Sequence, residues 1–565
     1  MDDEQRMEGH ISELKFNSGE SLAIRQNDIV VFVGPNNAGK SQCLKDIYTL
    51  SEKKIKTVVV SDIKVAKQRG SLKSLLNNVS NGSEQGEYIT YSVLGHMVHY
   101  WKESSDQSFL RDPYYEEFRD LFLINLDTAA RLSICTPPKV VNRTETKRHP
   151  IHYAASDRKY RKWLSDNFKR AFGVAVTPNV LNGATVPLCI GEPVSLNNED
   201  YDDEQQRLEA YAEVLETYKQ VQDQGDGVKS FTGILLYLML DYYRTYLIDE
   251  PESFLHPPQA RIMGQIIGNT LSDMQQAFIS THSEEIIKGL LETCPQRIKI
   301  VRITRINDTN SFSILDNDQF SAVWNDPLLK HSNIMSSLFH KSVALCESDS
   351  DCQMYSIVEN YTKQLAGKYS ETLFIHCGGK HRMARVATAL KSLNIDVRLI
   401  PDIDILNNEE VFRSTTEAYG IEWESIERDY RVIVSNLHRP RERVNRNDAK
   451  TTIDRVLDGS ATTDLSSQEI HDIRAAISII SKWAELKSHG FSAIPAGDAA
   501  AAFKRIERTL REHGIYIVPV GELEGFVREV GGHGPEWVNK VLETYPDLSD
   551  DVYVQIRQFI TEMNL

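Results

Sequence analysis

Short runs of consecutive apolar residues recur along the chain and predict buried β-strands. The run 29–33 leads into a glycine-bounded loop and then into apolar spacing typical of a helix up to residue 50. Other runs of strand length end at residues 249, 280, 346 and 400. Continuous rather than alternating apolar runs are typical of parallel strands covered on both faces. The pattern therefore predicts an α/β protein built on open parallel sheets.

Residues 51–220 follow a different pattern. The segments 112–132 and 202–221 combine charged and apolar positions at the spacing of amphipathic helices. We expect a helical insertion at about residues 80–220, which could serve in dimerisation. The basic stretches 139–150 and 156–163 could contact nucleic acid or a partner protein, but an exposed helical face is the simpler interpretation.

Length and composition add broad limits. A chain of 565 residues is too long for one core and should divide into about two to four domains. With 41% hydrophobic and 25% charged residues it has an ordinary globular composition, and no apolar run is long enough to span a bilayer. We expect no membrane partner, a cytoplasmic location and reduced thiols, since the seven cysteines lack metal-binding or disulfide spacing.

The charge balance is acidic, with local exceptions. A formal net charge of −16 argues against a protein coated with nucleic acid, because neutralising phosphates needs lysine and arginine. The run 438–450 is nevertheless rich in arginine, and the run 197–204 is densely acidic. Each can be a solvated surface or loop, so the basic run gains weight only from its neighbours.

The loop after the first apolar run carries a phosphate-binding motif. The segment "GPNNAGKS" (34–41) fits GxxxxGK[ST] between a strand and a helix, the context that gives this motif its meaning. Lys40 would contact the β- and γ-phosphates of ATP, and the hydroxyl of Ser41 would coordinate Mg²⁺. The loop residues expected to bind the cofactor are Gly34, Asn36, Asn37, Gly39, Lys40 and Ser41.

Two later strands end in residues that complete a nucleotide site. In "YRTYLIDEPE" (243–252), Asp249 would support the Mg²⁺ shell and Glu250 would polarise the attacking water. In "AFISTHSEE" (277–285), another apolar run delivers His282, which could sense or contact the γ-phosphate. His282 alone would be an ordinary core or helix-start histidine, but the other two motifs favour a functional role.

These three motifs resemble the ABC-type ATPases of the structural-maintenance and recombination-repair kind, over about residues 8–310. In that resemblance "GPNNAGKS" is Walker A, "YLIDEPE" is Walker B and "STHS" holds the switch histidine. It implies a signature loop that completes the nucleotide site of a neighbouring subunit, and "QGDGVKSF" (224–231) stands in that position with Gly227 and Ser230. It also implies a head-to-head homodimer.

In the second half of the chain, carboxylates repeatedly follow apolar runs. Glu347 ends "SVALCE", with Asp351 close behind it, and Asp402 and Asp404 lie in "VRLIPDIDIL" (397–406). Glu522 and Glu524 follow the run 514–520. The carboxyl ends of parallel strands meet at one edge of a sheet, so these acids should converge.

Convergent carboxylates indicate a site for divalent cations. Asp402 and Asp404 would share one face if their strand continued through them, and like charges side by side are unfavourable without a cation. Two ions, Mg²⁺ or alternatively Mn²⁺, could position a water and stabilise the leaving oxygen of a phosphodiester. The competing interpretation is that acids after strands simply cap helices.

The second half also resembles the Toprim domain of topoisomerases and related nucleases. Glu347 and Asp351 fit its first acidic motif and Asp402 and Asp404 fit its DxD motif. Joined behind an ABC-type ATPase, this arrangement is similar to the OLD (overcoming lysogenization defect) nuclease family, which includes the Gabija nuclease and retron-associated effectors. The family usually has glycine after the first glutamate, where this chain has Ser348. We expect an ATPase domain at 1–335 and a parallel-sheet Toprim domain at 336–565.

The resemblance implies further site residues and partners. It implies a late acidic ligand, for which Glu524 is the choice, and a catalytic lysine, for which Lys540 is the best-placed candidate. The implied function is ATP-regulated DNA cleavage in anti-phage defence, by a homodimer or higher oligomer. Its partner would be a retron reverse transcriptase with its noncoding RNA and DNA, or a helicase-like protein. The rival is a nucleotide-dependent sensor whose second half binds a partner without cutting DNA.

Overall fold

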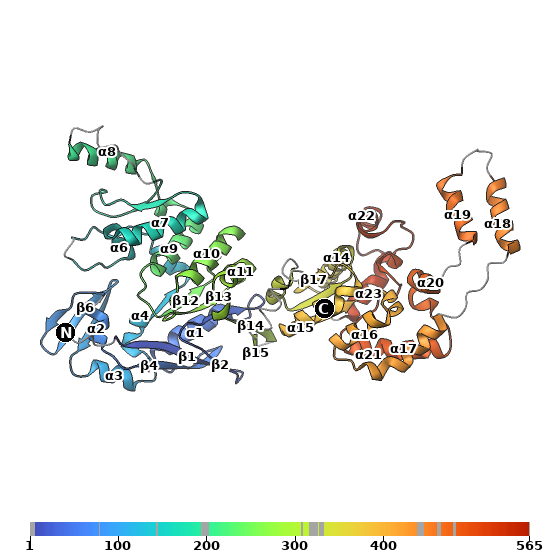
Figure 1. Cartoon of the computed structure of the whole chain (residues 1–565), viewed down its shortest axis with the longest axis horizontal. Coiled ribbons are helices and arrows are strands. Elements are labelled where there is room, and N and C mark those ends of the chain that lie inside the picture. The colour runs from blue at the N-terminus through green and yellow to red at the C-terminus, as the bar shows by residue number, and fades with distance from the viewer. Residues whose placement is uncertain are drawn as a thin grey trace. The chain divides into compact units, whose positions relative to one another are not determined.

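The chain forms two compact units, residues 1–322 and 323–565, in a computed structural model (Figure 1). The expected boundary at residue 335 therefore lies inside the second unit. The structure describes residues 6–563 except for 78, 143–144, 193, 195–202, 307–308, 316–325, 327–332, 438–445, 460–464 and 478–481. The acidic run 197–204 and the basic run 438–450 thus lie largely outside the described residues.

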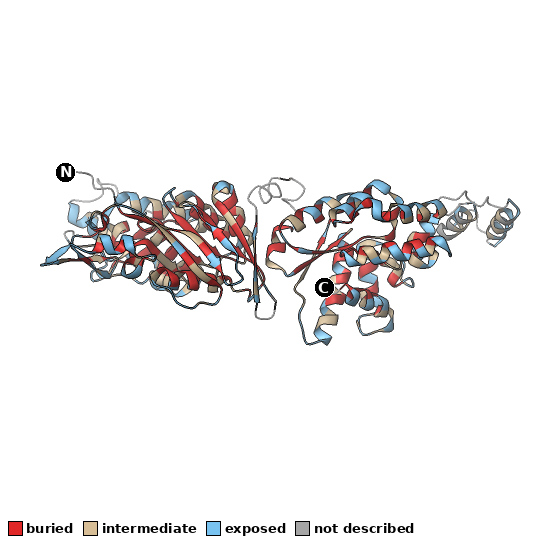
Figure 2. Cartoon of the chain, turned by 90° about the horizontal axis from the view of Figure 1, so that it is seen from below, coloured by how far each residue is buried: buried red, intermediate tan, exposed pale blue. Residues whose placement is uncertain are grey.

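A six-stranded sheet forms the centre of the first unit. Its order is β15-β14-β3-β13-β12-β8, and every neighbouring pair is parallel except β14 with β15. The central strands are buried along their whole length, which explains their continuous apolar sequence (Figure 2). The strands are β3 (Ile29–Val33), β8 (Leu123–Leu126), β12 (Thr245–Asp249), β13 (Gln276–Ser280), β14 (Ile298–Ile306) and β15 (Thr309–Leu315).

Helices follow the three motif-bearing strands of this sheet. α1 (Lys40–Glu52) follows β3, α10 (Pro257–Thr270) follows β12, and α11 (Glu284–Thr293) follows β13. α10 and α11 pack backbone to backbone at Gly264 and Gly289, where a Cβ would overlap the facing helix. A separate antiparallel sheet has the order β2-β1-β4, with β1 (Glu8–Phe16), β2 (Ser21–Ala23) and β4 (Val60–Gln68).

The region expected to be a helical insertion is mixed. It contains two antiparallel sheets, β5-β6-β7 and β11-β10-β9. Their strands are β5 (Ser83–Gln85), β6 (Tyr88–Val93), β7 (His96–Trp101), β9 (Val176–Pro178), β10 (Leu188–Ile190) and β11 (Lys219–Gln220). The helices of this part of the chain are α2 (Leu72–Asn77), α3 (Ser105–Arg111), α4 (Arg119–Phe122), α5 (Thr128–Ser133), α6 (Pro150–Ser156), α7 (Arg158–Phe172), α8 (Glu204–Glu216) and α9 (Asp226–Leu238).

Two helices were expected within that region, and the structure contains only one of them as a continuous helix. The expectation for 202–221 is confirmed over most of its length by α8. The expectation for 112–132 is wrong, because the segment is divided by β8, which pairs with β12 at the edge of the central sheet. Leu123 and Leu126 are buried in that sheet, and tertiary pairing has overridden the local helical spacing.

A parallel sheet of order β17-β16-β18 organises the second unit. Its strands are β16 (Ser342–Cys346), β17 (Thr372–His376) and β18 (Asp396–Ile400). The segment 514–518, expected to be β-rich, runs beside β18: Leu399 N–H donates to Gly514 (2.9 Å) and Tyr516 N–H donates to Leu399 (2.8 Å). The segment therefore extends the sheet beyond β18, although it makes only one isolated bridge with it.

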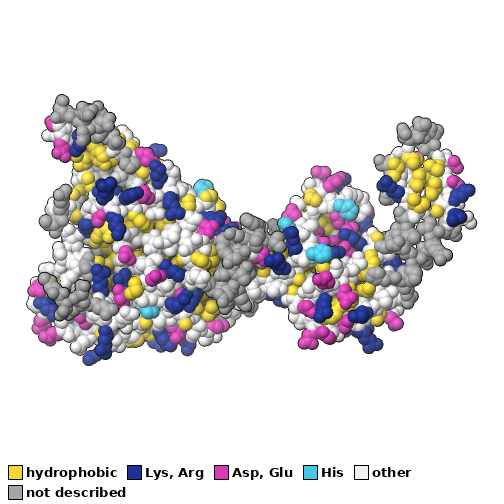
Figure 3. Space-filling view, viewed as in Figure 1, with side chains coloured by type: hydrophobic (Ala, Val, Ile, Leu, Met, Phe, Trp, Pro, Cys, Tyr) yellow, Lys and Arg dark blue, Asp and Glu magenta, His cyan; other side chains and the backbone are white. Residues whose placement is uncertain are grey.

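Helices surround this second sheet. One buried cluster joins α14 to the C-terminal helices. It includes Tyr355 on α14 together with Trp537, Tyr553 and Phe559. Figure 3 shows apolar side chains on the helical pair α18 and α19, where Leu457, Ile470 and Ile477 are exposed. The helices are α14 (Asp349–Leu365), α15 (Met383–Ser392), α16 (Glu409–Ala418), α17 (Trp423–Leu437), α18 (Arg446–Asp458), α19 (Ser467–Ile477), α20 (Lys482–His489), α21 (Asp498–Glu512), α22 (Gly534–Thr544) and α23 (Val554–Glu562).

Two expectations from composition can be compared with this fold. All seven cysteines are buried and none is in a disulfide in the structure. Within the described part of the chain, no helix has both the length and the apolar character that a membrane span needs.

Candidate functional site

The phosphate-binding loop joins the end of β3 to the start of α1. Gly34 and Gly39 have φ angles of 143° and 99°, a region that side chains disfavour. A Cβ on Gly34 would also overlap the carbonyl oxygen of Ile303 on β14. Backbone conformation and close packing therefore both require glycine at position 34, and the loop opens onto the amino end of α1, where anions bind readily.

Lys40 is the buried cation of this loop. Its side chain is almost enclosed, and Nζ donates to the carbonyl oxygens of Gly34 (2.8 Å) and Pro35 (2.7 Å). Burial lowers the pKa of Lys40 to about 8, although nearby carboxylates, Glu250 foremost, act in the opposite direction. Phosphate oxygens would replace the two carbonyls as partners. The other predicted loop residues, Asn36, Asn37 and Ser41, are exposed or half-buried beside it.

The expected Walker B carboxylates stand at the carboxyl end of β12. Asp249 accepts a short hydrogen bond from the hydroxyl of Ser280, at the end of the adjacent strand β13. Glu250 has a φ of 48°, which costs an ordinary residue about 1–2 kcal/mol. Its N–H donates to the Ser280 carbonyl (2.9 Å) and its Oε2 accepts from the Ser253 hydroxyl (3.2 Å).

His282 reaches the same edge from β13. Its Nε2 lies 3.4 Å from Glu250 Oε1, and its N–H donates to Glu252 Oε1 (2.6 Å). Burial, and then the positive charge of Lys40, lower the pKa of His282. Burial also raises the pKa of Glu252, whose role no sequence motif indicates. Lys40, Asp249, Glu250 and His282 thus meet as expected, because β3, β13 and β12 are neighbours.

The expected signature loop begins α9. Gly227 is half-buried in its first turn, and a Cβ there would crowd the carbonyl of Phe254, which follows Walker B. Ser230 is fully buried and its hydroxyl has no hydrogen-bond partner among the described residues. Ser230 therefore lies on the inner side of the helix, and its expected contact with a second subunit's nucleotide stays a prediction.

In the second unit, Glu347, Asp402 and Asp404 come together. Each offers an oxygen within 4.8 Å of the others'. Glu347 directly follows β16, whereas Asp402 and Asp404 lie beyond the end of β18, the second of them in the 3₁₀ helix η7 (Ile403–Asn407). The assumption that the strand continues through both aspartates is thus wrong, because the chain turns after Pro401, but their convergence does not depend on it.

The burial of these carboxylates is unusual without a cation. Glu347 Oε2 and Asp404 Oδ1 are buried and have no hydrogen-bond partner among the described residues. Burial, and then the charges of neighbouring acids, raise the pKa of Asp402 well above its usual range and also raise that of Glu347. Orphaned oxygens and repelling carboxylates are what a hard divalent cation such as Mg²⁺ or Mn²⁺ would satisfy.

Asp351 and Ser348 form the amino end of α14. Ser348 N–H donates to Asp351 Oδ2 (2.8 Å), and Asp351 N–H donates to the Ser348 hydroxyl (3.4 Å). The helix-capping interpretation therefore applies to Asp351, whose second oxygen remains for another role. Ser348 has a φ of −125°, so serine in place of the family's glycine causes no backbone strain. Burial raises the pKa of Asp351, and Glu524 contributes to the increase.

Glu524 belongs to a second group with Glu522 and His533, whose ligand atoms also lie within 4.8 Å of one another. Its Oε1 accepts from Gly534 N–H (2.8 Å) and lies 3.4 Å from His533 Nδ1. Glu524 therefore influences Asp351 but is not part of the group formed by Glu347, Asp402 and Asp404. His533 was not selected from the sequence, where a lone histidine after two glycines carries no distinct signal.

Two lysines that were not selected lie beside the first group. Lys380 Nζ is 2.9 Å from Asp404 Oδ2, and Lys487 Nζ is 3.2 Å from Glu522 Oε2 and 3.9 Å from Asp404 Oδ2. Lys540 instead pairs with Glu536 (2.6 Å) on α22. The Gly-Gly-Lys sequence after β17 could have indicated Lys380, but Lys487 lies in a helix without any motif.

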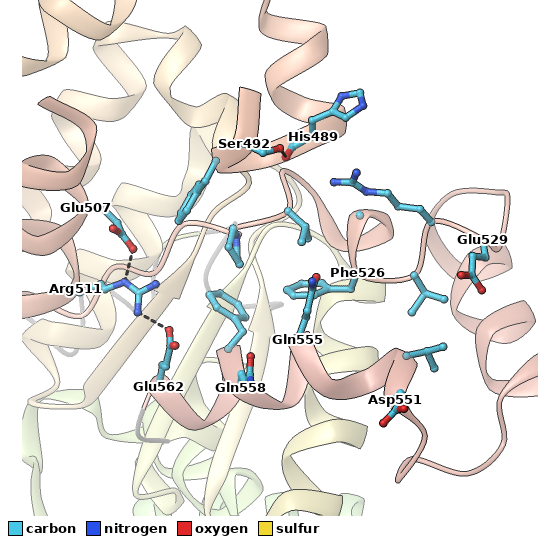
Figure 4. Close-up of a pocket in the computed structure, with 18 residues that line it drawn as sticks. His489, Ser492, Glu507, Arg511, Phe526, Glu529, Asp551, Gln555, Gln558 and Glu562 are labelled. Carbon is cyan, nitrogen blue, oxygen red and sulfur yellow. Dashed lines mark hydrogen bonds and ion pairs between the residues drawn. The ribbon is translucent and has the colours of Figure 1, made fainter. Parts of the chain in front are cut away.

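A cavity of about 780 Å³ lies next to the loop that carries Glu522 and Glu524 (Figure 4). Phe491, Phe526 and Phe559 contribute apolar surface to its lining. Arg511 spans part of it by pairing with Glu507 (2.7 Å) and Glu562 (2.6 Å). Residues 519, 520 and 525–529 of this loop line the cavity, whereas Glu522 and Glu524 do not.

Comparison with known proteins bears on the first unit. Residues 190–288 match a family described as AAA domain, putative AbiEii toxin, Type IV TA system. This match spans α9, Walker B and the His282 strand. No curated protein matches the chain.

Several solved structures of SMC head domains align with about half of the chain. A SmcHead bound to the C-winged helix domain of ScpA is 12% identical, covering 56% of this chain and 100% of its own, with a TM-score of 0.33. The SMC head domain from Thermotoga maritima is 13% identical, covering 55% and 100%, with a TM-score of 0.28. The family match and the geometry of the three motifs show that the first unit has a P-loop ATPase-like fold.

Proposed function

We propose that the chain is an ATP-binding, metal-dependent DNA endonuclease of the OLD type, in which nucleotide regulates cleavage. The observation that carries the proposal is the convergence of Glu347, Asp402 and Asp404, with orphaned buried oxygens, at the edge of a parallel sheet. That group belongs to the same chain as an ABC-type nucleotide site. A role as effector in bacterial anti-phage defence follows from the family resemblance.

The nucleotide site contains residues suited to each task in ATP hydrolysis. Lys40 would bind the β- and γ-phosphates, and Asp249 would hold the Mg²⁺ shell together with Ser41. Glu250 would accept the proton of the attacking water, since His282 and Ser253 orient its carboxylate. His282, whose pKa is lowered by burial, would contact the γ-phosphate. Gly227 at the start of α9 is where a second copy would approach in a head-to-head dimer.

The carboxylates of the second unit are suited to phosphodiester hydrolysis. Two Mg²⁺ or Mn²⁺ ions would supply Lewis-acid stabilisation of the attacking and leaving oxygens. Glu347, Asp402 and Asp404 would hold one end of the site, and Asp351 with Glu524 the other. Lys380 and Lys487 place positive charge beside these acids, where an anionic DNA backbone would also bind. Lys540 remains the candidate implied by the family resemblance.

The proposed partners are DNA, a second copy of this chain and a further defence component. A reverse transcriptase with the noncoding RNA and DNA of a retron, and a helicase-like protein, are the two expected kinds. The genes beside this one would identify the partner directly.

A cleavage assay with matched variants tests the proposal. Asp402→Asn should lower Mg²⁺- or Mn²⁺-dependent cleavage of supercoiled and linear DNA by at least about a hundredfold, because even changes to residues that only hydrogen-bond to metal ligands cost about 10- to 100-fold. ATP hydrolysis should be unaffected. Asp349→Asn is the control, because Asp349 is an exposed neighbour on α14. Lys40→Ala should remove nucleotide binding and the effect of ATP on cleavage.

The rival function predicts a different result. If the second unit only binds a partner, the wild-type chain with its partner will cut no DNA in either metal. Asp402→Asn would then bind that partner as the wild type does. These two results together would contradict the nuclease proposal and support a function as a nucleotide-dependent sensor.

A further inference from the structure

We infer that Arg131 is a positioning residue of the ATP site, which fixes the Walker B turn to the signature helix α9. The inference rests on the ATP-hydrolysis part of the proposed function and extends it to a residue that no motif includes. Arg131 lies on the short helix α5, directly after the edge strand β8.

Arg131 is completely buried. Its side chain has no exposed surface, and burial lowers the pKa of its guanidinium group. A buried cation is expensive unless other groups compensate its charge. Among the described residues no carboxylate is in ion-pair contact with it, and its Nε is buried without a hydrogen-bond partner. Burying this positive charge costs free energy, and no ion pair within the described residues offsets it. A buried charge of this kind indicates a function beyond packing.

The compensation comes from the nucleotide site. Asp249 is the strongest of the acids whose charge stabilises the guanidinium, followed by Glu252. Nη1 donates to the backbone carbonyl of Asp249 in a short hydrogen bond and more weakly to that of Leu126 (3.4 Å). Nη2 donates to the Thr128 hydroxyl (3.2 Å). Arg131 therefore bonds the main chain of Walker B and does not occupy the Asp249 carboxylate, which could support Mg²⁺.

This bond fixes one peptide group from both sides. The peptide between Asp249 and Glu250 has its carbonyl held by Arg131 and its N–H held by the Ser280 carbonyl. The same peptide precedes the φ of 48° at Glu250. Because sparsely populated backbone conformations persist only where the surroundings determine them, the two bonds stabilise the orientation of the Glu250 carboxylate.

The helix of Arg131 is also locked to the signature helix. A Cβ on Gly233 of α9 would overlap the Arg131 carbonyl oxygen, so the two backbones are in direct contact. Cys135 Sγ, just after α5, donates to the carbonyl of Lys229 on α9 (3.2 Å). A movement of α9 would therefore displace α5 and Arg131, and with them the Walker B turn. Engagement of the signature loop by a second copy would thus reach Glu250 through Arg131.

The test separates positioning from simple stability. Arg131→Gln and Arg131→Lys are compared with Leu238→Ala, which removes a buried side chain at the far end of α9 without touching Asp249. Affinity for a fluorescent ATP analogue, the rate of single-turnover ATP hydrolysis and the melting temperature are measured for each full-length variant. We expect Arg131→Gln to hydrolyse bound ATP at least about tenfold more slowly than Leu238→Ala, with ATP affinity changed less than about threefold, and Arg131→Lys to be intermediate.

Equal hydrolysis rates for Arg131→Gln and Leu238→Ala would overturn the inference, as would a loss confined to ATP affinity. If Arg131→Gln does not fold, Arg131→Lys decides. A reduced rate at unchanged ATP affinity and melting temperature supports positioning, and a wild-type rate overturns it. A wild-type chain that hydrolyses no ATP would instead refute the ATPase part of the proposed function.

Discussion

Lys40 and Glu250 show how single residues of the nucleotide site are set by their surroundings. Lys40 donates hydrogen bonds to two carbonyl oxygens of its own loop. These neutral oxygens stabilise its positive charge less than phosphate oxygens would. Glu250 keeps a strained backbone because Arg131 and the Ser280 carbonyl hold the peptide before it. Both residues are therefore prepared for a ligand rather than optimised for the free protein.

The pKa of Lys40 leads to a prediction on nucleotide binding. In the free protein this pKa is about 8, so the ammonium is largely lost above that pH. Bound phosphates favour the charged form and raise the pKa, hence ATP binding at about pH 9 should take up a proton, whereas binding at about pH 7.5 should involve little uptake at Lys40. ATP affinity should then fall as pH rises above 8.

Calorimetry in two buffers of different ionisation enthalpy measures this uptake. Lys40→Arg is the matched control, because arginine stays charged throughout this range and should show no additional uptake at the higher pH. Buffer-independent binding heats for the wild type at about pH 9 would contradict the prediction.

Lys487 gives a second prediction at the residue scale. Burial alone would lower the pKa of Lys487, but Asp404 and Glu522 raise it, so its ammonium neutralises acids that a metal ion would also use. Lys487→Gln should therefore bind Mn²⁺ several-fold more tightly in the absence of DNA, as titrated by electron paramagnetic resonance. Lys540→Gln should leave the affinity unchanged, because Lys540 pairs with Glu536. Weaker Mn²⁺ binding by Lys487→Gln would show that the lysine supports the site instead.

At the scale of elements, helix α20 and the loop that carries Glu522 and Glu524 form one packed unit. Phe491 N–H, just beyond α20, donates to the Pro519 carbonyl (2.9 Å), and Ile403 N–H donates to the Gly521 carbonyl (3.0 Å). The loop thus joins α20 on one side to the 3₁₀ helix that contains Asp404 on the other. Its geometry depends on backbone contacts that a side chain would block.

Gly521 tests this packing. Its φ is 108°, and a Cβ there would overlap the carbonyl of Lys487. Gly521→Ala should lower the free energy of unfolding of the second unit by more than about 1 kcal/mol, because backbone strain and steric overlap both destabilise the folded state. Gly367→Ala is the control, since Gly367 also has a positive φ but open space around it, and it should cost only about 1 kcal/mol. If urea unfolding showed equal losses of free energy for the two variants, the prediction would be contradicted, because α20 would then have moved to make room for the new side chain without loss of stability.

Sequence patterns predicted those elements whose apolar runs are continuous. β3, β12, β13, β16 and β18 all lie where such runs were recognised, and so the motif residues at their ends could be expected to converge. β8 was missed because four residues at a sheet edge resemble a helical segment until β12 is known to pair with them. Lys380, Lys487 and Arg131 were missed because contacts between distant segments, which no local pattern records, give them their roles.

At the scale of the whole molecule, the two units each have their own core and their own candidate ligand. The nucleotide residues lie within residues 1–322 and the carboxylate group lies within residues 323–565. A ligand stabilises only the folded unit that binds it, by an amount that grows with its concentration relative to Kd. Each unit should therefore respond to its own ligand.

Scanning calorimetry of the full-length chain tests this division. ATP at about 100 times its Kd should stabilise the first unit by about 2.7 kcal/mol and raise only its transition, and Mn²⁺ should raise only that of the second unit. Lys40→Ala should abolish the first shift and spare the second, while Asp402→Asn should do the reverse. If ATP shifted both transitions in the Asp402→Asn chain, the units would be thermodynamically coupled even without metal. Nucleotide control of cleavage would then act through stability shared by the two units rather than through a change of access to the carboxylates.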